Sequence, residues 1–206
     1  MSRIMKAVLA LLILPMSLYA GESNAQQARK LFNSVYHMVF ASKGCTLHYD
    51  VNIIGIYKTK GVISYKGKKS RYIEDRYQSW NDGVTAYMVD KKKKAVKIYR
   101  ADDDNKDGYL AKFKYDLNNF EYSWKEGKDG IQLILRPKTS HLIGIRQVVG
   151  VLDSKTHYPK YLRIKVAFFW TTVKISHFST DELSDNIFVF PRQQFSSYSF
   201  TDHRKD

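Results

Sequence analysis

Cysteine and proline are both scarce in this sequence of 206 residues, and each shortage excludes a class of architecture. Cys45 is the only cysteine, so no disulfide can form within one chain. A chain of this length can rely on its hydrophobic core instead of cross-links. Only 4 prolines are present, which argues against a design of several domains joined by linkers. We therefore expect one domain held together by its core.

The sequence also lacks the motifs that organise many active sites. It contains no Gly-x-Ser-x-Gly nucleophile elbow and no phosphate-binding glycine loop. Cys45 and His48 are neighbours in sequence, which does not make a nucleophile and base pair. We expect no enzymatic activity, no catalytic residue, no bound metal and no cofactor. The histidines lack the i, i+4 spacing of a helical zinc pair: His37, His48, His141, His157, His177 and His203.

The acidic loop at residues 103–108 has some of the features of a calcium-binding loop. Asp103, Asn105, Asp107 and Gly108 fall at the first, third, fifth and sixth places of an EF-hand loop. The twelfth place of that loop requires a bidentate Glu, and Lys114 stands there instead. A solvated acidic turn is therefore the favoured interpretation, and a cation site is the alternative.

The first twenty residues differ from the rest of the chain. Arg3 and Lys6 form a short basic start, the apolar run 7–18 follows, and Ala20 ends it with a small residue. This pattern is typical of a secretory signal peptide, and the run is too short to span a membrane. A buried N-terminal helix is the alternative, but the run has no polar face. We expect cleavage after residue 20, or alternatively after residue 25.

Positive charge dominates the chain, with a formal net charge of +14. Such a balance favours anionic partners, namely phospholipid surfaces, acidic proteins or nucleic acid. Export argues against nucleic acid. The basic run Lys91–Lys94 lies between two predicted strands. It either keeps a hairpin edge soluble or docks on an acidic partner or membrane leaflet.

A single amphipathic helix is predicted at the start of the mature chain. Ser23 or Asn24 can cap its beginning, and Gly44 lies just beyond its end. The opposite face of the helix is polar, so we expect it to pack on a sheet. Its apolar positions recur at helical spacing: Ala28, Leu31, Phe32, Val35, Met38 and Val39.

Short strand-like runs separated by turn signals fill the rest of the chain. There is no alternation of strands and helices, so we expect an antiparallel sandwich or barrel. About eleven strands are predicted: 47–53, 62–66, 70–77, 84–89, 95–100, 120–124, 131–135, 145–152, 161–169, 172–178 and 187–190.

Large aromatic side chains are concentrated in one stretch of these strands, between residues 65 and 124. Curved sheets often enclose a ligand cavity, so binding of an apolar ligand and plain core packing are equally favoured. The residues are Tyr65, Tyr72, Trp80, Tyr87, Tyr99, Phe113, Tyr115, Phe120, Tyr122 and Trp124.

Four segments and the order of the elements resemble a known family, the periplasmic outer-membrane lipoprotein carriers (LolA-like). Residues 61–66 look like the family's second strand, and 80–87 are similar to its Ser-Asp-Gly-x-Thr-x-aromatic hairpin. Residues 131–138 match a strand that ends in Pro-Lys, and 188–191 are similar to its closing Phe-x-Phe-x-Pro. The resemblance covers nearly all of the mature chain, residues 21–206.

The resemblance implies a mainly β fold with some α, in which a strongly curved, open antiparallel sheet forms a half-barrel under an N-terminal helix and a lid. It implies a periplasmic, monomeric carrier that shields lipoprotein acyl chains between the inner and outer membranes. Its partners would be those chains, an inner-membrane lipoprotein-releasing transporter and an outer-membrane acceptor. We expect these residues to line the cavity: Leu31, Val35, Met38, Tyr65, Tyr72, Tyr87, Tyr99, Phe113, Phe120, Tyr122, Trp124, Leu133 and Leu135.

The sequence departs from the family in two places. Gly67 stands where well-known members carry an Arg that ties the sheet to the lid, and the candidate lid 101–119 is short and acidic. The end of the chain, 195–206, has no clear counterpart. A structural or docking protein of the cell envelope, with a filled core and no lipid cargo, is the alternative function.

Overall fold

The computed structural model describes residues 22–53, 57–103, 117–139 and 144–204. The predicted signal peptide, Phe113, and most of the acidic loop and of the candidate lid lie outside these residues. Among the helices that are described, none has the length and apolar character needed to cross a membrane.

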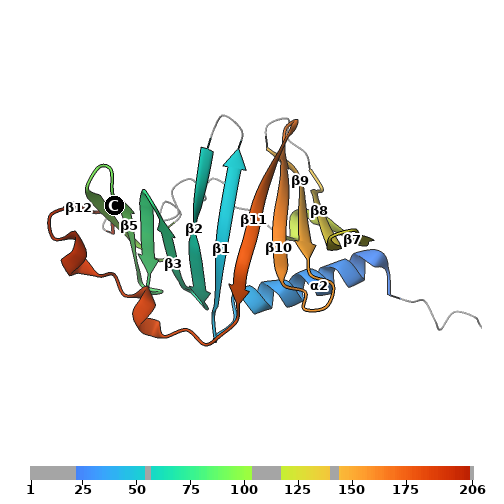
Figure 1. Cartoon of the computed structure of the whole chain (residues 1–206), viewed down its shortest axis with the longest axis horizontal. Coiled ribbons are helices and arrows are strands. Elements are labelled where there is room, and N and C mark those ends of the chain that lie inside the picture. The colour runs from blue at the N-terminus through green and yellow to red at the C-terminus, as the bar shows by residue number, and fades with distance from the viewer. Residues whose placement is uncertain (1–21, 54–56, 104–116, 140–143, 205–206) are drawn as a thin grey trace, which may run out of the picture.

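One sheet of twelve strands organises the described residues (Figure 1). Its strand order is β12-β6-β5-β4-β3-β2-β1-β11-β10-β9-β8-β7. The strands are β1 Cys45–Ile53, β2 Tyr57–Lys66, β3 Lys69–Glu74, β4 Tyr77–Asn81, β5 Thr85–Asp90, β6 Ala95–Arg100, β7 Phe120–Gly127, β8 Gly130–Pro137, β9 Ile145–Leu152, β10 Pro159–Val166, β11 Phe169–Ser179 and β12 Ser199–Asp202.

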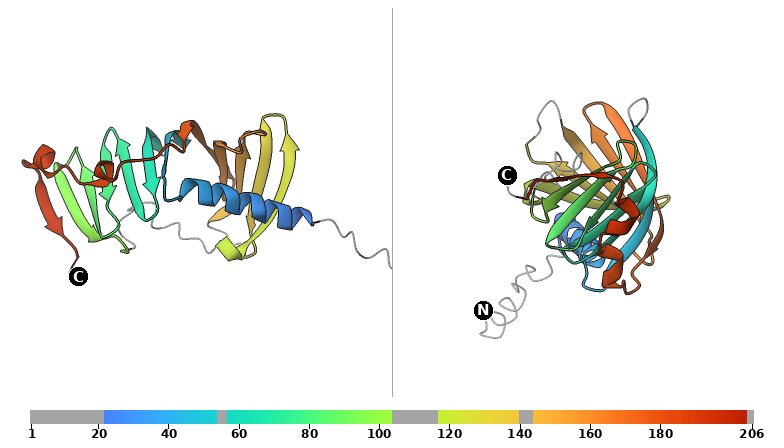
Figure 2. Two further views of the ribbon diagram at one scale, coloured as in Figure 1. Left: turned by 90° about the horizontal axis from the view of Figure 1, so that it is seen from below. Right: turned by 90° about the vertical axis from the view of Figure 1, so that its left-hand side faces the viewer.

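The sheet is open and curved, with β12 at one edge and β7 at the other. Seen end-on, it curls like part of a barrel (Figure 2). Neighbouring strands pair antiparallel except at the edge, where β12 pairs parallel with β6. The predicted open, curved antiparallel sheet is therefore confirmed, apart from the parallel β12–β6 pair. The described strands form one open sheet and not the sandwich or closed barrel that the strand spacing favoured. The segment 101–119 connects β6, near one edge, to β7 at the opposite edge.

Three local differences from the prediction have physical reasons. The run 70–77 contains most of β3 and the first residue of β4, because the chain turns after Glu74. The short strand β12 has a polar sequence without apolar alternation. The predicted strand 187–190 is absent, and its first two residues belong instead to a 3-10 helix, η4 (Asp185–Phe188). The Ser184 side chain caps that turn, which satisfies its backbone locally.

The predicted helix is present as α2 (Asn24–Val39), and of the two predicted caps, Ser23 and Asn24, Ser23 is the one that caps it. The Ser23 side chain accepts a hydrogen bond from the Gln26 amide, and the Gln26 side chain accepts one from the Ser23 amide. This reciprocal capping box fixes the start of the helix. The helix packs against β7 and β8 (Figure 2).

The two faces of the sheet follow from the strand register, because paired residues on antiparallel neighbours project to the same side. We call the side contacted by α2 the helix face. Tyr122 of β7 and Leu135 of β8 are paired there, and both pack with Ala28 of α2. The opposite side, which contains Trp80 of β4 and its partner Tyr87 of β5, is the tail face.

The tail face over β4, β5 and β6 is covered by the C-terminal segment, residues 180–198, which follows β11. Phe188 of η4 is only 1% exposed. Phe195, in the 3-10 helix η5 (Arg192–Phe195), packs with Trp80, Val89 and Val96. The helix and the C-terminal segment thus cover different halves of the sheet on opposite faces (Figure 1).

Candidate functional site

A fixed contact between α2 and the edge strand β7 anchors the candidate site. The Asn24 side chain donates to the Trp124 carbonyl at 2.8 Å and accepts from the Trp124 amide at 3.0 Å. The Trp124 indole N–H donates to Oε1 of Gln27 at 2.9 Å. The Arg29 guanidinium lies 4.5 Å from the centre of the Tyr122 ring. These bonds hold the N-terminal half of α2 on the sheet edge.

From this anchor, a continuous row of aromatic rings runs along α2 and back onto the sheet. Phe32 contacts Tyr122 with ring centres 5.3 Å apart, and it lies 6.1 Å from Tyr36. Tyr36 in turn lies 4.7 Å from Phe40, the residue that ends the helix. We call Phe32, Tyr36, Phe40, Tyr65 and Tyr72 the aromatic row.

The far end of the aromatic row lies on the helix face of β2 and β3. Phe40 is 5.0 Å from Tyr65, and Tyr65 is 6.0 Å from Tyr72 in an edge-to-face arrangement. The Tyr65 and Tyr72 hydroxyls also hydrogen-bond to each other. Tyr36 is 44% exposed and Phe40 is 38% exposed, so the middle of the row presents apolar surface to solvent.

Most of the predicted lining residues lie on the helix face, but they differ in burial. Leu31, Val35 and Met38 are half-buried on α2. Tyr99 belongs to the helix face by register and is buried, with its ring stacked 5.0 Å from His203. The residues buried or half-buried in the contact with α2 are Phe120, Tyr122, Trp124, Leu133 and Leu135.

Tyr87 is not brought to this face. Its ring stacks on Phe190 of the C-terminal segment, with centres 4.3 Å apart and planes 4° apart. Phe113 lies outside the described residues. Phe32, Tyr36 and Phe40 are not among the predicted lining residues. Their i, i+4, i+8 spacing, which puts aromatic rings on one side of a helix, is the signal that could have found them.

The helix face also has a polar element in its middle. Tyr49 of β1 pairs with Gly61 of β2, and Gly61 pairs with Glu74 of β3. The Tyr49 hydroxyl hydrogen-bonds the Glu74 carboxylate. Since Gly61 has no side chain, the phenol can lie across β2.

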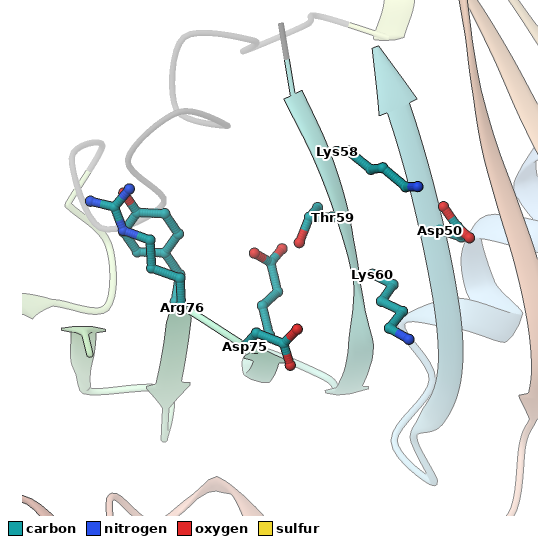
Figure 3. Close-up of a pocket in the computed structure, with 8 residues that line it drawn as sticks. Asp50, Lys58, Thr59, Lys60, Asp75 and Arg76 are labelled. Atoms are coloured by element: carbon teal, nitrogen blue, oxygen red, sulfur yellow. The ribbon is translucent and has the colours of Figure 1, made fainter. Parts of the chain in front are cut away.

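An open pocket of about 630 Å³ lies beside this element (Figure 3). The last residues that pair between β2 and β3 are Gly61 and Glu74. The pocket forms beyond this pair, where β2 continues without β3 beside it. Its lining is rich in charged groups, which suit a polar molecule better than an acyl chain. The lining residues are Asp50, Lys58, Thr59, Lys60, Glu74, Asp75, Arg76 and Tyr77.

The turn between β2 and β3, where the family Arg would stand, is tied to the C-terminal segment. The Lys66 ammonium donates to the Leu183 carbonyl at 2.7 Å and lies 3.0 Å from the Asp185 carboxylate. Lys69 lies 3.1 Å from the same carboxylate. Hydrogen bonds from these two lysines hold the pKa of Asp185 below its usual value. Gly67 itself has φ +56°, a conformation that favours glycine, and no atom lies near its missing side chain.

The described residues form no group of three or more His, Cys, Asp or Glu side chains that could hold a metal ion. His48 and His177 lie side by side across β1 and β11, with ring centres 4.7 Å apart. Cys45 is fully buried, and that burial raises the pKa of its thiol to about 11. A thiol with so high a pKa is a poor nucleophile at neutral pH.

Comparison with known proteins yields a likeness of fold. No protein-family model and no curated protein match the sequence. The crystal structure of an uncharacterized conserved protein from Thermus thermophilus superposes with a TM-score of 0.59 at 10% sequence identity. The match covers 86% of this chain and 100% of that chain. At this identity, the likeness shows a shared fold alone.

Two further solved structures are similar at a TM-score of 0.44. One is a DUF1329 family protein from Desulfovibrio piger ATCC 29098, at 12% identity, covering 82% of this chain and 98% of that chain. The other is described as an outer membrane lipoprotein-sorting protein domain from Vibrio parahaemolyticus, at 11% identity, covering 84% and 99%. A likeness of this strength supports no inference about function.

Proposed function

We propose that this chain is a periplasmic carrier that shelters the acyl chains of lipoproteins on the helix face of its sheet. It would move them from the inner to the outer membrane. The observation that carries the proposal is the aromatic row, which joins α2 to β2 and β3 and leaves Tyr36 and Phe40 part-exposed.

The physical argument concerns the transfer of acyl chains through water. Each exposed methylene costs about 0.8 kcal/mol, so an unshielded lipoprotein does not leave a membrane readily. The aromatic row offers flat apolar surfaces along α2 and onto β2 and β3. Because its rings are part-exposed, cargo can enter and leave without unfolding a sealed core.

Two features of the sequence agree with this proposal. The N-terminal segment is typical of a signal peptide, and four segments resemble the lipoprotein carrier family. Three of those segments correspond to β2, to β4 with β5, and to β8. The fourth, around Phe188, lies in the C-terminal segment and covers the tail face.

The test is binding of an apolar fluorescent dye to the mature protein, followed by displacement with a triacylated lipopeptide. We expect dye uptake at micromolar protein and full reversal by the lipopeptide. Phe40→Ser should weaken both about fivefold, because part of the aromatic surface is lost. Val189→Ser is the matched control, since Val189 is an exposed apolar residue of the C-terminal segment.

Three results would contradict the proposal. Absence of dye uptake would favour a filled core and thus a structural or docking protein of the envelope. Uptake that the lipopeptide fails to reverse, or that Phe40→Ser leaves unchanged, would show that the aromatic row does not hold acyl chains.

A further inference from the structure

The hairpin between β10 and β11 ends in an exposed aromatic tip. Val166 pairs with Phe169, so Ala167 and Phe168 form a two-residue turn. Phe168 is 88% exposed and Phe169 is 75% exposed. A folded chain ordinarily buries such side chains, and two adjacent ones in water are a costly arrangement. We call Phe168, Phe169 and Trp170 the aromatic tip.

Cationic side chains stand directly behind the aromatic tip. The Arg163 guanidinium lies 4.6 Å from the centre of the Trp170 ring, and the Lys165 ammonium lies 5.9 Å from it. Trp170 is itself 38% exposed. The hairpin therefore presents apolar rings at its end, then an amphipathic indole, then positive charge.

More positive charge lies at the same end of the sheet. In the antiparallel order, the β10–β11 and β5–β6 turns fall at one end of the strands, and the hairpin of β10 and β11 turns at the top of Figure 1. The β5–β6 turn is the basic run Lys91–Lys94, in which all four residues are exposed. The β4–β5 turn, with the exposed Val84, lies at the opposite end.

We propose that the aromatic tip inserts into the interface of an anionic lipid bilayer. Rings at the end of a hairpin can enter the acyl boundary, and an indole is favoured at headgroup depth. Arg163, Lys165 and the Lys91–Lys94 run would meet the lipid phosphates. A second copy of the chain is a poorer occupant, because each copy carries a formal net charge of +14.

This proposal goes beyond the carrier function and does not depend on it. Trp170 pairs with Lys165, and Arg163 pairs with Thr172 two residues further along the same strands. Both pairs project to the tail face. The aromatic row lies on the helix face. By the same alternation Phe169 projects to the helix face, but it lies at the β10–β11 turn, whereas Tyr65 of the row lies near the β2–β3 turn at the opposite end of the strands. Membrane docking through the aromatic tip and acyl-chain binding at the row can therefore be tested separately.

The experiment is co-sedimentation of the mature protein with vesicles of phosphatidylcholine alone or with about 30 mol% phosphatidylglycerol. We expect binding to the anionic vesicles that weakens as salt rises. Phe168→Ser with Phe169→Ser should lower partitioning at least about tenfold. Arg163→Gln should lower it about fivefold, as expected for one charge near an anionic surface. Val84→Ser is the control and should bind like the wild type.

Three results would overturn the proposal. They are equal binding by the double Phe variant, equal binding to neutral vesicles, and a concentration-dependent dimer that the double Phe variant abolishes. The dye and lipopeptide assay on the double Phe variant separates the two proposals. If the double Phe variant still binds the lipopeptide but no longer binds vesicles, the aromatic tip serves membrane docking and not acyl-chain binding.

Discussion

The Tyr49 hydroxyl hydrogen-bonds the Glu74 carboxylate across Gly61, which lies between them on the helix face of the sheet. A β-carbon added at Gly61 would lie 2.9 Å from the Tyr49 hydroxyl oxygen and 2.6 Å from the Ile73 carbonyl oxygen. The missing side chain is therefore what permits a link across three strands.

Gly61→Ala should consequently destabilise the protein by about 1–3 kcal/mol, the usual range for overpacking. Urea unfolding at neutral pH measures this change. Gly150→Ala is the matched control, because its new β-carbon would meet Leu162 at an ordinary 3.6 Å. Equal stability of the two variants would show that the crossing at Gly61 carries no constraint.

Phe188 and Val189 are neighbours in sequence with opposite surroundings. Phe188 is 1% exposed, whereas Val189 is 60% exposed. We expect Phe188→Ala to cost about 3–5 kcal/mol through the cavity that it leaves, and Val189→Ala to cost almost nothing. Thermal unfolding of both variants checks the difference. A mild effect at Phe188 would mean that the C-terminal segment contributes little to the core.

The same two residues show the limit of what sequence periodicity can predict. Phe188-Val189-Phe190 alternates like a strand, yet none of the described strands pairs with it. Periodicity reports which side chains are buried, but it does not report whether the backbone finds a partner in a sheet. The helix was predicted, and ten of the eleven predicted runs correspond to strands of the sheet, because their local patterns and their pairing agree. One of these runs, 70–77, spans parts of both β3 and β4. The strand β12 was not predicted, because this edge strand of four residues has no alternation of apolar and polar residues.

The candidate site was predicted less completely, for a related reason. Alternation places Tyr87 and Tyr99 on opposite faces, but it does not say which face receives α2 and which receives the C-terminal segment. That choice depends on contacts between residues far apart in sequence, such as Phe190 with Tyr87. The spacing of Phe32, Tyr36 and Phe40 can be seen in the sequence. Such a stripe on a helix is normally interpreted as core packing, so these residues were not predicted to bind a ligand.

Lowering the pH should loosen the C-terminal segment through Asp185. Hydrogen bonds from Lys66 and Lys69 lower the pKa of this carboxyl in the folded chain. The contact is therefore fully present above the ordinary Asp pKa of about 3.9 and is lost as the pH falls through the lowered value.

NMR titration of the Asp185 carboxyl carbon tests this directly. We expect a higher pKa in Lys66→Gln than in the wild type, and faster hydrogen exchange of the segment 180–198 in Asp185→Asn at neutral pH. Asp181→Asn serves as the control, since Asp181 hydrogen-bonds its near neighbour Ser179 through both its carboxylate and its amide. An unchanged pKa in Lys66→Gln would contradict the contact.

Cys45 should titrate and react only at unusually high pH. Burial raises the pKa of its thiol from 9.0 to about 11, so at pH 8 the native chain holds about a hundredfold less thiolate than the unfolded chain. Between pH 9 and 11 the folded state binds more protons at this position, so stability falls as the pH rises.

We expect native labelling by a disulfide reagent to be at least about a hundredfold slower than labelling in urea. Cys45→Ala should show a shallower loss of stability over that pH range. Fast native labelling would instead place the thiol within reach of solvent and remove the cause of its raised pKa.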